Sequence, residues 1–399
     1  MSKPKGFEKP SGVRDYLPHA VTKLRRIERE VLACMDCWGY RQIMTPTMEY
    51  YDTVGVASST SDQKLFKLLN KHGTTMVLRS DLTAPIARVM SSLLKDEPLP
   101  VRLSYHANVF RAIEEEAGRE AEFFQTGVEL VGDDTPEADA EVIALAIESL
   151  KAAGVEKFKI AMGHMGFLNG LLQEVLPERT EDQESLKQDL LNRDYVGYRN
   201  TIAGLKLTEE QQNRLEEVLK LRGGREVAGQ ALDISSNELA RASIEHLCRV
   251  WEVLEAYDAA KHVLFDLTML GDFSYYTGMT FEGYAAELGS PVASGGRYDK
   301  LLQQFGRAIP ATGFALKTTR ILDGVQGEEI TEELPVLIRY TAAYRKAGLA
   351  KASELRAEGR TVITSLISDT DEAVARVEGE AAVSGSMLHR GYQEIITFQ

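Results

Sequence analysis

The sequence predicts an α+β protein, in which helices flank an antiparallel sheet, a helical insertion interrupts the sheet, and a small α/β unit follows. Segments with the alternation typical of strands lie on both sides of a helical interval at about residues 165–262. A charged linker, residues 326–334, then precedes a shorter strand–helix–strand pattern. At 399 residues, the chain is long enough for two or three domains. We expect a core domain over residues 1–325 and a small domain over residues 335–399.

The amino-terminal part of the core domain is predicted to alternate helix and strand. Residues 21–40 form an amphipathic helix, because apolar residues recur near helical spacing: Leu24, Ile27, Val31, Leu32 and Met35. Residues 40–55 follow as an extended segment. Residues 74–94 then form a strand, a turn and a helix that either Asp81 or Thr83 can cap.

The rest of the core domain is predicted to supply the sheet. Residues 101–113 and 123–132 form an antiparallel pair of strands, and residues 138–154 form a helix. Further strands are expected at these positions in chain order: residues 158–163, 262–268, 279–288, 294–306 and 313–325, the last of which turns into a helix. The small domain is predicted to run as strand, helix, strand, helix and strand.

The composition indicates a soluble globular protein, with 44% hydrophobic and 27% charged residues. The start of the sequence lacks the apolar core of a signal peptide, and no apolar run approaches the length of a membrane span. We therefore expect a cytoplasmic protein with no membrane association. The net charge of −14 lowers the expectation of nucleic-acid binding, since proteins that grip a phosphate backbone are usually basic.

The three cysteines do not make a complete metal site. Cys34 and Cys37 have the spacing of half a zinc site, but no second pair of ligands accompanies them. Together with Cys248, they are expected to be buried or half-buried reduced thiols, and a metal or redox role is the alternative. We expect no metal and no cofactor.

Polar residues on neighbouring predicted strands form a candidate site. Arg111, Gln125, Glu129 and Tyr276 are expected to point toward one face of the sheet. Carboxylates and a carboxamide suit a ligand that carries N–H donors, such as an ammonium group or an imidazole. Each residue alone is more simply explained as a solvated strand position, so the hypothesis depends on their lying together.

Seven segments, in order along the chain, resemble a known family. They are "PSGVRDYLP", "GYRQIMTPTMEYYDTVG", "LRSDLT", "FRAIEEEAGREAEFFQTGVELVG", "SYYTGMTFEGY", "SGGRYDKL" and "ATGFALKTTRIL". They resemble the catalytic core of class II histidyl-tRNA synthetases, and more closely the paralogous family of regulatory subunits of ATP phosphoribosyltransferase. The resemblance spans residues 10 to about 325 and implies a fold like that of class II aminoacyl-tRNA synthetases.

The resemblance also implies a pocket for histidine. The histidine-binding positions that it implies are Asp81, Thr83, Arg111, Gln125, Glu129, Tyr275 and Tyr276. Asp81, with Thr83 beside it, would face the amino group, and Glu129 and Tyr276 would face the imidazole. Arg111 and Arg320 would be remnants of a nucleotide site.

Departures from the synthetase pattern argue against catalysis. Synthetases have an arginine at the head of the tyrosine motif, where this chain has residues 271–274 (Gly-Asp-Phe-Ser) before Tyr275. Removing one such charge stabiliser typically costs about 10²–10³ in rate. Ile113 replaces a glutamate, residues 114–116 are three glutamates where synthetases have a basic residue, and Phe124 replaces a histidine. We therefore expect no catalytic residue, and a pocket that binds without activating.

The resemblance accordingly implies a regulatory subunit. It would support a short-form catalytic ATP phosphoribosyltransferase at the first step of histidine biosynthesis and would confer feedback control by histidine. It would form a self-dimer within a hetero-octamer and would not bind tRNA. The alternatives are a working histidyl-tRNA synthetase and a histidine sensor of synthetase descent for another enzyme. Residues 335–399 lie where synthetases bind the anticodon but have no basic or aromatic run for RNA, so structural filler or a partner-docking module is expected there.

Overall fold

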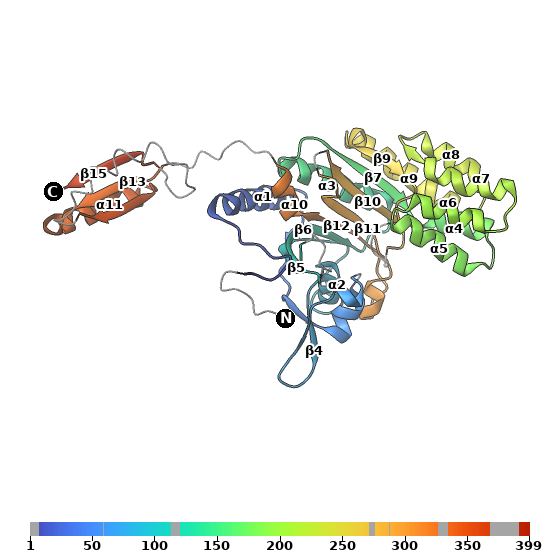
Figure 1. Ribbon diagram of the computed structural model, residues 1–399, viewed down its shortest axis with the longest axis horizontal. Coiled ribbons are helices and arrows are strands. Elements are labelled where there is room, and N and C mark those ends of the chain that lie inside the picture. Colours follow the sequence, from blue (N-terminus) through green and yellow to red (C-terminus); the bar gives the residue numbers. More distant parts are fainter. Residues whose placement is uncertain are drawn as a thin grey trace. The chain divides into compact units, whose positions relative to one another are not determined.

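The structure, a computed structural model, describes residues 8–58, 60–112, 120–270, 276–286, 288–325, 334–367 and 391–399 (Figure 1). The chain divides into two compact units, Met1–Gln326 and Gly327–Gln399. The larger unit combines a broad sheet with helices, and the smaller one combines a helix with a short sheet. The predicted α+β class is therefore confirmed.

The main sheet of the larger unit has nine strands within the described residues, in the order β1-β5-β6-β12-β11-β10-β7-β9-β8. Their bounds are Arg41–Gln42 (β1), Val101–Phe110 (β5), Glu122–Val131 (β6), Phe158–His164 (β7), Arg222–Gly223 (β8), Val263–Asp266 (β9), Met279–Ala285 (β10), Ala293–Arg297 (β11) and Ala311–Lys317 (β12). The predicted antiparallel pairing of β5 with β6 is confirmed. Strand β6 also pairs with β12, so hydrogen bonds hold it on both sides.

Most neighbouring strands of the sheet are antiparallel, in line with the prediction, but two of the strand pairs are parallel. Strand β1 runs parallel to β5, and β7 runs parallel to β9. Parallel neighbours need a long crossover connection, and the helical insertion provides that connection between β7 and β9. The alternation of apolar residues does not reveal strand direction, so it could not identify the two parallel pairs.

Two long helices, α1 (Pro18–Cys37) and α3 (Pro136–Ala152), cover one face of the sheet. Helix α1 buries Leu24, Ile27, Val31 and Met35 along one side, as its apolar spacing predicts. Val128 and Leu130 of β6 belong to the same hydrophobic core as α1 and α3. Because side chains alternate along a strand, Glu129 points to the opposite face.

The interval that was predicted to be helical holds a group of helices: α4 (Met165–Val175), α5 (Thr180–Leu191), α6 (Tyr195–Gly204), α7 (Glu209–Glu217), α8 (Val227–Ile234) and α9 (Glu238–Ala256). In Figure 1 they gather at the end of the sheet where β7 and β9 lie. Helix α9 packs against both α3 and α4, and so joins this group to the sheet. The sequence did not predict β8, a two-residue strand that pairs with β9 inside this interval.

A second, smaller sheet of the larger unit has the order β2-β4-β3 in the described residues, with bounds Met48–Tyr50 (β2), Lys67–Leu69 (β3) and Thr75–Leu78 (β4). The predicted turn and helix follow β4, and the helix is α2 (Thr83–Ser91). The prediction of an extended segment over residues 40–55 is partly wrong, because Tyr51–Gly55 forms a helical turn. That turn buries Val54 in an apolar cluster with Leu82, and this packing overrides the local preference for strand.

The smaller unit contains a parallel sheet in the order β14-β13-β15, with bounds Val336–Tyr340 (β13), Val362–Leu366 (β14) and Glu394–Phe398 (β15). Helix α11 (Arg345–Ala357) buries Ala352 and Leu355 against Val336 and Ile338 of the sheet. The predicted strand, helix, strand and final strand are therefore confirmed. The second helix predicted for this unit lies outside the described residues.

The cysteines are free thiols, and their exposure differs from the prediction in one case. Cys34 and Cys248 are half-buried, as expected, but Cys37 is exposed because it lies at the carboxyl end of α1, beyond the buried face of that helix. Across the described ranges, no three His, Cys, Asp or Glu side chains are grouped so as to hold a metal ion. The described helices include none that is both long enough and apolar enough to cross a membrane.

Candidate binding pocket

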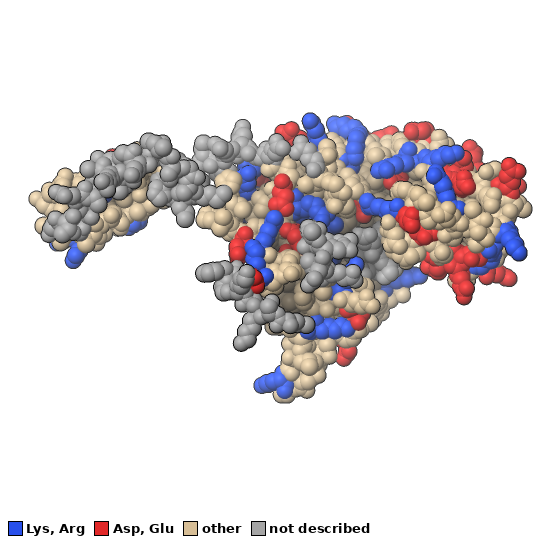
Figure 2. Space-filling view, in the orientation of Figure 1, with Lys and Arg blue, Asp and Glu red and all other residues tan. Residues whose placement is uncertain are grey.

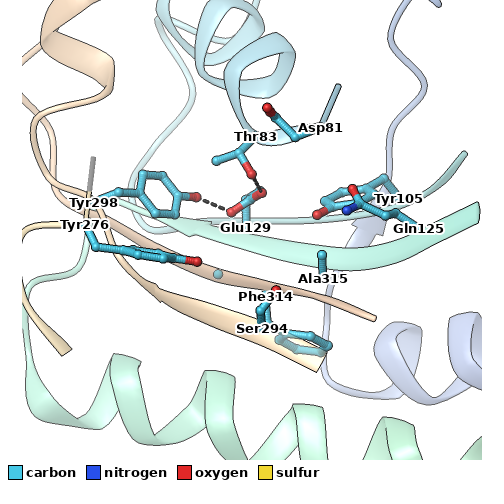
Figure 3. Close-up of a pocket in the computed structure, with 11 residues that line it drawn as sticks. Asp81, Thr83, Tyr105, Gln125, Glu129, Tyr276, Ser294, Tyr298, Phe314 and Ala315 are labelled. Carbon is cyan, nitrogen blue, oxygen red and sulfur yellow. Dashed lines mark hydrogen bonds between the residues drawn. The ribbon is translucent and has the colours of Figure 1, made fainter. Parts of the chain in front are cut away.

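A hollow lies on the face of the main sheet opposite α1 and α3 (Figure 3). Eleven described residues line it: Asp81, Thr83, Tyr105, Gln125, Glu129, Tyr276, Ser294, Tyr298, Gly313, Phe314 and Ala315. The hollow has a volume of about 330 Å³ including its open mouth.

Glu129 lies at the centre of the pocket, and its side chain is almost fully buried. The Thr83 hydroxyl donates to Oε1 at 2.8 Å, and the Tyr298 hydroxyl donates to Oε2. Burial raises the pKa of Glu129 to about 8, and the hydrogen bonds from Tyr298 and Thr83 offset this only in part. At neutral pH the carboxyl group is therefore largely protonated, and an added N–H donor or positive charge would favour its ionised form.

Glycines make room for this carboxyl group. A Cβ atom on Gly313 would collide with Oε2 of Glu129 and with the carbonyl oxygen of Val128. On Gly127 it would collide with the carbonyl oxygen of Phe314. Strand β12 can therefore pass beside the Glu129 carboxyl group only because Gly313 has no side chain, and β6 and β12 can pair closely at Gly127 for the same reason.

Asp81 is the second acidic residue that lines the pocket. Asp81 is 5% exposed. Its Oδ2 accepts from the Ser58 hydroxyl at 2.9 Å and from the Ser80 hydroxyl at 3.3 Å. Its Oδ1 accepts from the backbone N–H of Ala84 at 3.1 Å, in the first turn of α2. Asp81 is therefore the residue that caps the helix, which leaves Thr83 to donate to Glu129.

Gln125 and Tyr276 complete the polar lining. Gln125 is 4% exposed, and its Oε1 has no hydrogen-bond partner within the described part of the protein. A buried acceptor of this kind needs a ligand or a water molecule. Tyr276 is half-buried, and its hydroxyl points into the hollow in Figure 3. Both residues offer oxygen acceptors to a bound molecule.

The arginines proposed from the sequence do not line the pocket. Arg111 donates from Nε to the carbonyl oxygen of Ser80 at 3.0 Å, and its guanidinium lies over the Phe123 ring. It thereby holds the backbone next to Asp81. Arg320 donates from Nη1 to the carbonyl oxygen of Pro291 at 3.0 Å. The proposed site residue Tyr275 lies outside the described residues, as do the segments 113–119 and 271–275, in which the departures from the synthetase pattern other than Phe124 fall.

Sequence reasoning missed several lining residues, of which Tyr298 is the most important. Tyr298 lies within the "SGGRYDKL" segment that carries part of the resemblance, but it was not among the proposed site residues. Counting alternate positions from Ser294 along β11 and just past its end places Gly296 and Tyr298 on the same face. That count was the signal that would have found Tyr298. Tyr105 gave no comparable signal, because its place opposite Gly127 depends on the register of β5 and β6.

The eleven described lining residues include two carboxylic acids, one amide and three phenols, and none of them is a lysine, arginine or histidine. This set can bind a small molecule that presents N–H donors or a positive charge. It supplies no cation with which to stabilise a phosphate in a transition state.

Comparison with known proteins gives consistent results. A family model described as histidyl-tRNA synthetase matches residues 12–321. A protein from Halalkalibacterium halodurans named ATP phosphoribosyltransferase regulatory subunit is 44% identical over 364 residues, which cover 91% of each chain. A protein of the same name from Bacillus subtilis is 44% identical over 362 residues, which cover 91% of this chain and 92% of the relative.

Solved structures share the fold. A crystal structure from Bacillus halodurans, described as an ATP phosphoribosyltransferase regulatory subunit/histidyl-tRNA synthetase, matches with a TM-score of 0.89 at 40% identity and covers 100% of both chains. Histidyl-tRNA synthetase from Nostoc matches with a TM-score of 0.77 at 20% identity, covering 94% of this chain and 89% of that one. The latter shows a likeness of fold alone. This chain belongs to the family of ATP phosphoribosyltransferase regulatory subunits, and its core has the fold of histidyl-tRNA synthetase.

Proposed function

We propose that this chain is a non-catalytic regulatory subunit that a short-form catalytic ATP phosphoribosyltransferase requires for activity and for feedback control by histidine. The relatives that share 44% of its residues are named for this regulatory role. The observation that supports the proposal most strongly is the pocket, whose described lining offers acids, an amide and phenols but no cation. The complex would act in the cytoplasm, at the first step of histidine biosynthesis.

Histidine suits the chemistry of the pocket. Its ammonium group and its imidazole are N–H donors, and the pocket presents oxygen acceptors. We assign the ammonium group to Asp81 and the imidazole to Glu129 and Tyr276. Oε1 of Gln125, which lacks a partner among the described residues, would accept a further donor. Binding would favour the ionised form of Glu129, because a positive charge nearby lowers a carboxyl pKa.

The same pocket is poorly suited to amino-acid activation. Adenylation brings the phosphates of ATP next to the amino-acid carboxylate, and their charge needs cations or N–H donors. The described contacts of Arg111 and Arg320 go to backbone carbonyl oxygens and an aromatic ring. Residues 271–275, where synthetases have an arginine, read Gly-Asp-Phe-Ser-Tyr. These observations support a protein that binds histidine without activating it.

Feedback control would follow from differential binding. The walls of the pocket come from α2 and from several strands of the sheet, so histidine would enter a form in which these walls stand further apart. A ligand that binds the opened form better shifts the protein toward it. Coupling free energies of this kind are typically about 1–3 kcal/mol, which is enough to lower the activity of an associated catalytic subunit several-fold or more.

Self-association through the β2-β4-β3 sheet is part of the proposal. The strand registers place Tyr50, Met76 and Leu68 on one face of this sheet. Tyr50 is 54% exposed, Leu68 is 40% exposed, and the neighbouring Met48 is 53% exposed. The tip that carries β4 is largely uncharged in Figure 2. Since β2 lies in the segment that resembles the dimer-forming motif 1, we assign this face to a second copy of the chain, within a hetero-octamer with four subunits of each type.

We also propose that the chain does not act on tRNA. Figure 2 shows basic and acidic side chains intermixed over the helical insertion, without a basic face in that view. The smaller unit would serve as structural filler or as a module that docks a partner.

Reconstitution with a short-form catalytic subunit tests the proposal. The two proteins would be co-expressed, and the condensation of ATP with phosphoribosyl pyrophosphate would be measured with and without L-histidine. We expect activity only with both proteins present, and inhibition by L-histidine. Glu129→Ala should raise the inhibitory histidine concentration about 10–100-fold, because imidazole donors lose a buried acceptor. Glu245→Ala, an exposed change on α9, is the matched control.

The rival functions give different results in the same set of assays. Histidine-dependent exchange of pyrophosphate into ATP by the chain alone would identify a working synthetase. Histidine binding without any effect on the phosphoribosyltransferase would identify a sensor for another enzyme. The self-association is tested by sedimentation of Tyr50→Glu, which should be monomeric, while Val196→Glu, at an exposed apolar position on α6, should associate like the wild type.

A further inference from the structure

Arg297 lies between two residues of the pocket wall but points away from the pocket. Gly296, on one side of it, lies under the Tyr276 ring, since a Cβ atom there would come within 3.0 Å of that ring. Tyr298, on the other side, donates its hydroxyl to Glu129. Because side chains alternate along a strand, Arg297 faces the opposite side of the sheet.

On that side, Arg297 is held by a buried acid. Its Nη2 lies 2.9 Å from Oδ1 of Asp139 on α3, and its Nε donates to Oδ2 at 3.1 Å. Asp139 is fully buried and Arg297 is 5% exposed. A further hydrogen bond runs from Nη1 of Arg297 to the carbonyl oxygen of Asp133 at 3.0 Å. The contact between Nη2 and Oδ1 is an ion pair and not a second hydrogen bond, so charge attraction and the hydrogen bonds from Nε and Nη1 together hold the guanidinium in place.

The helical insertion supplies the third member of this group. Nε2 of His246, on α9, lies 2.8 Å from Oδ2 of Asp139. Asp139 has a lowered pKa: burial acts to raise it, but the hydrogen bond from His246 and the charge of Arg297 outweigh that effect. An ionised carboxylate only accepts hydrogen bonds, so the imidazole nitrogen donates. His246 therefore ties the insertion to the acid that holds Arg297.

The backbone of Arg297 extends the connection to Tyr276. Its carbonyl oxygen accepts from the backbone N–H of Thr277 at 2.8 Å. The Thr277 hydroxyl in turn accepts from the backbone N–H of Asp299 at 3.0 Å. Oδ1 of Asp299 accepts from Nη1 of Arg297 at 3.2 Å, which closes a ring of contacts. The residue next to Tyr276 is thus anchored to the end of β11 at two points.

We propose that His246 is a positioning residue for the pocket: through Asp139 and Arg297 it holds the strand end that carries Tyr298 and anchors Tyr276. The affinity of the pocket for histidine then depends on how the helical insertion is seated against the sheet. This inference rests on the proposed histidine site. It assigns to the insertion a regulatory role that the lining residues alone do not suggest.

The test compares substitutions of His246 in the full chain. His246→Leu fills the space but cannot donate to Asp139, whereas His246→Gln retains an N–H donor. We expect His246→Leu to weaken L-histidine binding about 10-fold in calorimetry, because the ligand must then order a strand end that is held less firmly in the free protein. His246→Gln should stay within about 3-fold of the wild type, and the Glu245→Ala control should bind like the wild type. If His246→Leu does not fold, His246→Ala replaces it with the same expectation.

Hydrogen exchange gives a readout that needs no ligand. The amides of Thr277 and Tyr298, which bond to the carbonyl oxygens of Arg297 and Ala311, should exchange faster in His246→Leu than in the wild type. Unchanged exchange at both amides would overturn the inference, whatever the ligand does. Faster exchange with unaltered histidine affinity would also overturn it. If the wild type does not bind histidine at all, the proposed function fails, and the exchange data still decide whether His246 positions the strand end.

Discussion

Two carboxyl groups of this protein are buried to nearly the same degree and behave in opposite ways. Glu129, in the pocket, is 2% exposed and has its pKa raised to about 8 by burial. Asp139, behind β11, is fully buried, yet its pKa lies below the ordinary value. The difference lies in their partners. Hydroxyl groups of Thr83 and Tyr298 surround Glu129, whereas His246 and Arg297 surround Asp139.

The contrast separates an acid that the fold itself uses from the acid that we propose binds a ligand. Asp139 already has cationic and N–H partners from its own chain, so it holds the fold together. The partners that the structure describes for Glu129 are hydroxyl donors alone, so none of them balances the charge that the carboxyl group would carry when ionised. An incoming molecule with N–H donors would supply what is missing. Burial alone therefore does not identify a functional acid, and the nature of the neighbouring donors does.

The largest expected effect comes from removing the structural acid. Asp139→Ala leaves the Arg297 guanidinium buried with a weakened set of partners, which typically costs about 3–5 kcal/mol of unfolding free energy. Urea unfolding of the purified chain measures it, with Glu245→Ala as the control. A loss below about 1 kcal/mol would mean that Asp299 and the carbonyl oxygen of Asp133 are enough to stabilise the buried Arg297 guanidinium. Asp139 would then not be a structural acid, and the contrast with Glu129 would be wrong.

The second prediction concerns Glu129, whose raised pKa should make the stability of the protein depend on pH. The folded-state pKa of Glu129, about 8, lies above its unfolded value, so its contribution to stability is fully present at low pH and is lost as the pH rises toward 8. Glu129→Gln removes this dependence. Relative to the wild type, it should therefore gain about 2–4 kcal/mol of unfolding free energy between pH 5.5 and pH 8.5. Urea unfolding across this range measures the gain, and parallel curves for the two proteins would show that Glu129 is ionised in the folded state.

A smaller effect is expected at the pocket wall. Tyr276→Phe removes one hydroxyl that points into the hollow and should weaken L-histidine binding about 3–10-fold, the usual value of one neutral hydrogen bond. Because the ring remains, the unfolding free energy should not change by more than about 0.5 kcal/mol. Calorimetry and urea unfolding measure the two quantities. Unchanged binding and unchanged histidine inhibition would place the effector site elsewhere, such as the contact with the catalytic subunit.

The smallest effect is expected at Arg320. Its Nη1 bonds to the carbonyl oxygen of Pro291, so Arg320→Ala should cost less than about 1 kcal/mol of stability. It should also leave histidine binding and inhibition unchanged. Equilibrium dialysis with ATP decides whether a nucleotide site remains. Binding of ATP to the wild type that Arg320→Ala abolishes would show that this arginine still serves a nucleotide.

The elements that sequence reasoning found are those with local signals. The spacing of Leu24, Ile27, Val31 and Met35 identified α1, and the alternation in residues 123–132 identified β6. For the pocket, the resemblance brought together Asp81, Thr83, Gln125, Glu129 and Tyr276, although the wall residues Tyr105 and Tyr298 were missed.

What the sequence did not reveal depends on contacts between distant positions. Asp139 is 158 positions from Arg297 and 107 positions from His246, and no local pattern connects them. The carbonyl partners of Arg111 and Arg320 likewise follow from the tertiary fold. The helical turn at Tyr51–Gly55 is set by packing of Val54, against the extended character of the segment. Long-range packing thus decides which charged groups pair within the fold, and no local pattern in the sequence reveals that pairing.

The absence of side chains at Gly127 and Gly313 has a consequence for how the pocket can change over evolutionary time. The depth of the hollow beneath Glu129 is set by main-chain atoms of β6 and β12. A side chain at Gly313 would collide with the acid itself, and one at Gly127 would collide with the main chain of β12; no smaller residue exists to deepen the site. A change in the ligand that the pocket prefers must therefore come from substitutions of the phenols and hydroxyls around its rim. The shape of its base is fixed by the main chain of the sheet.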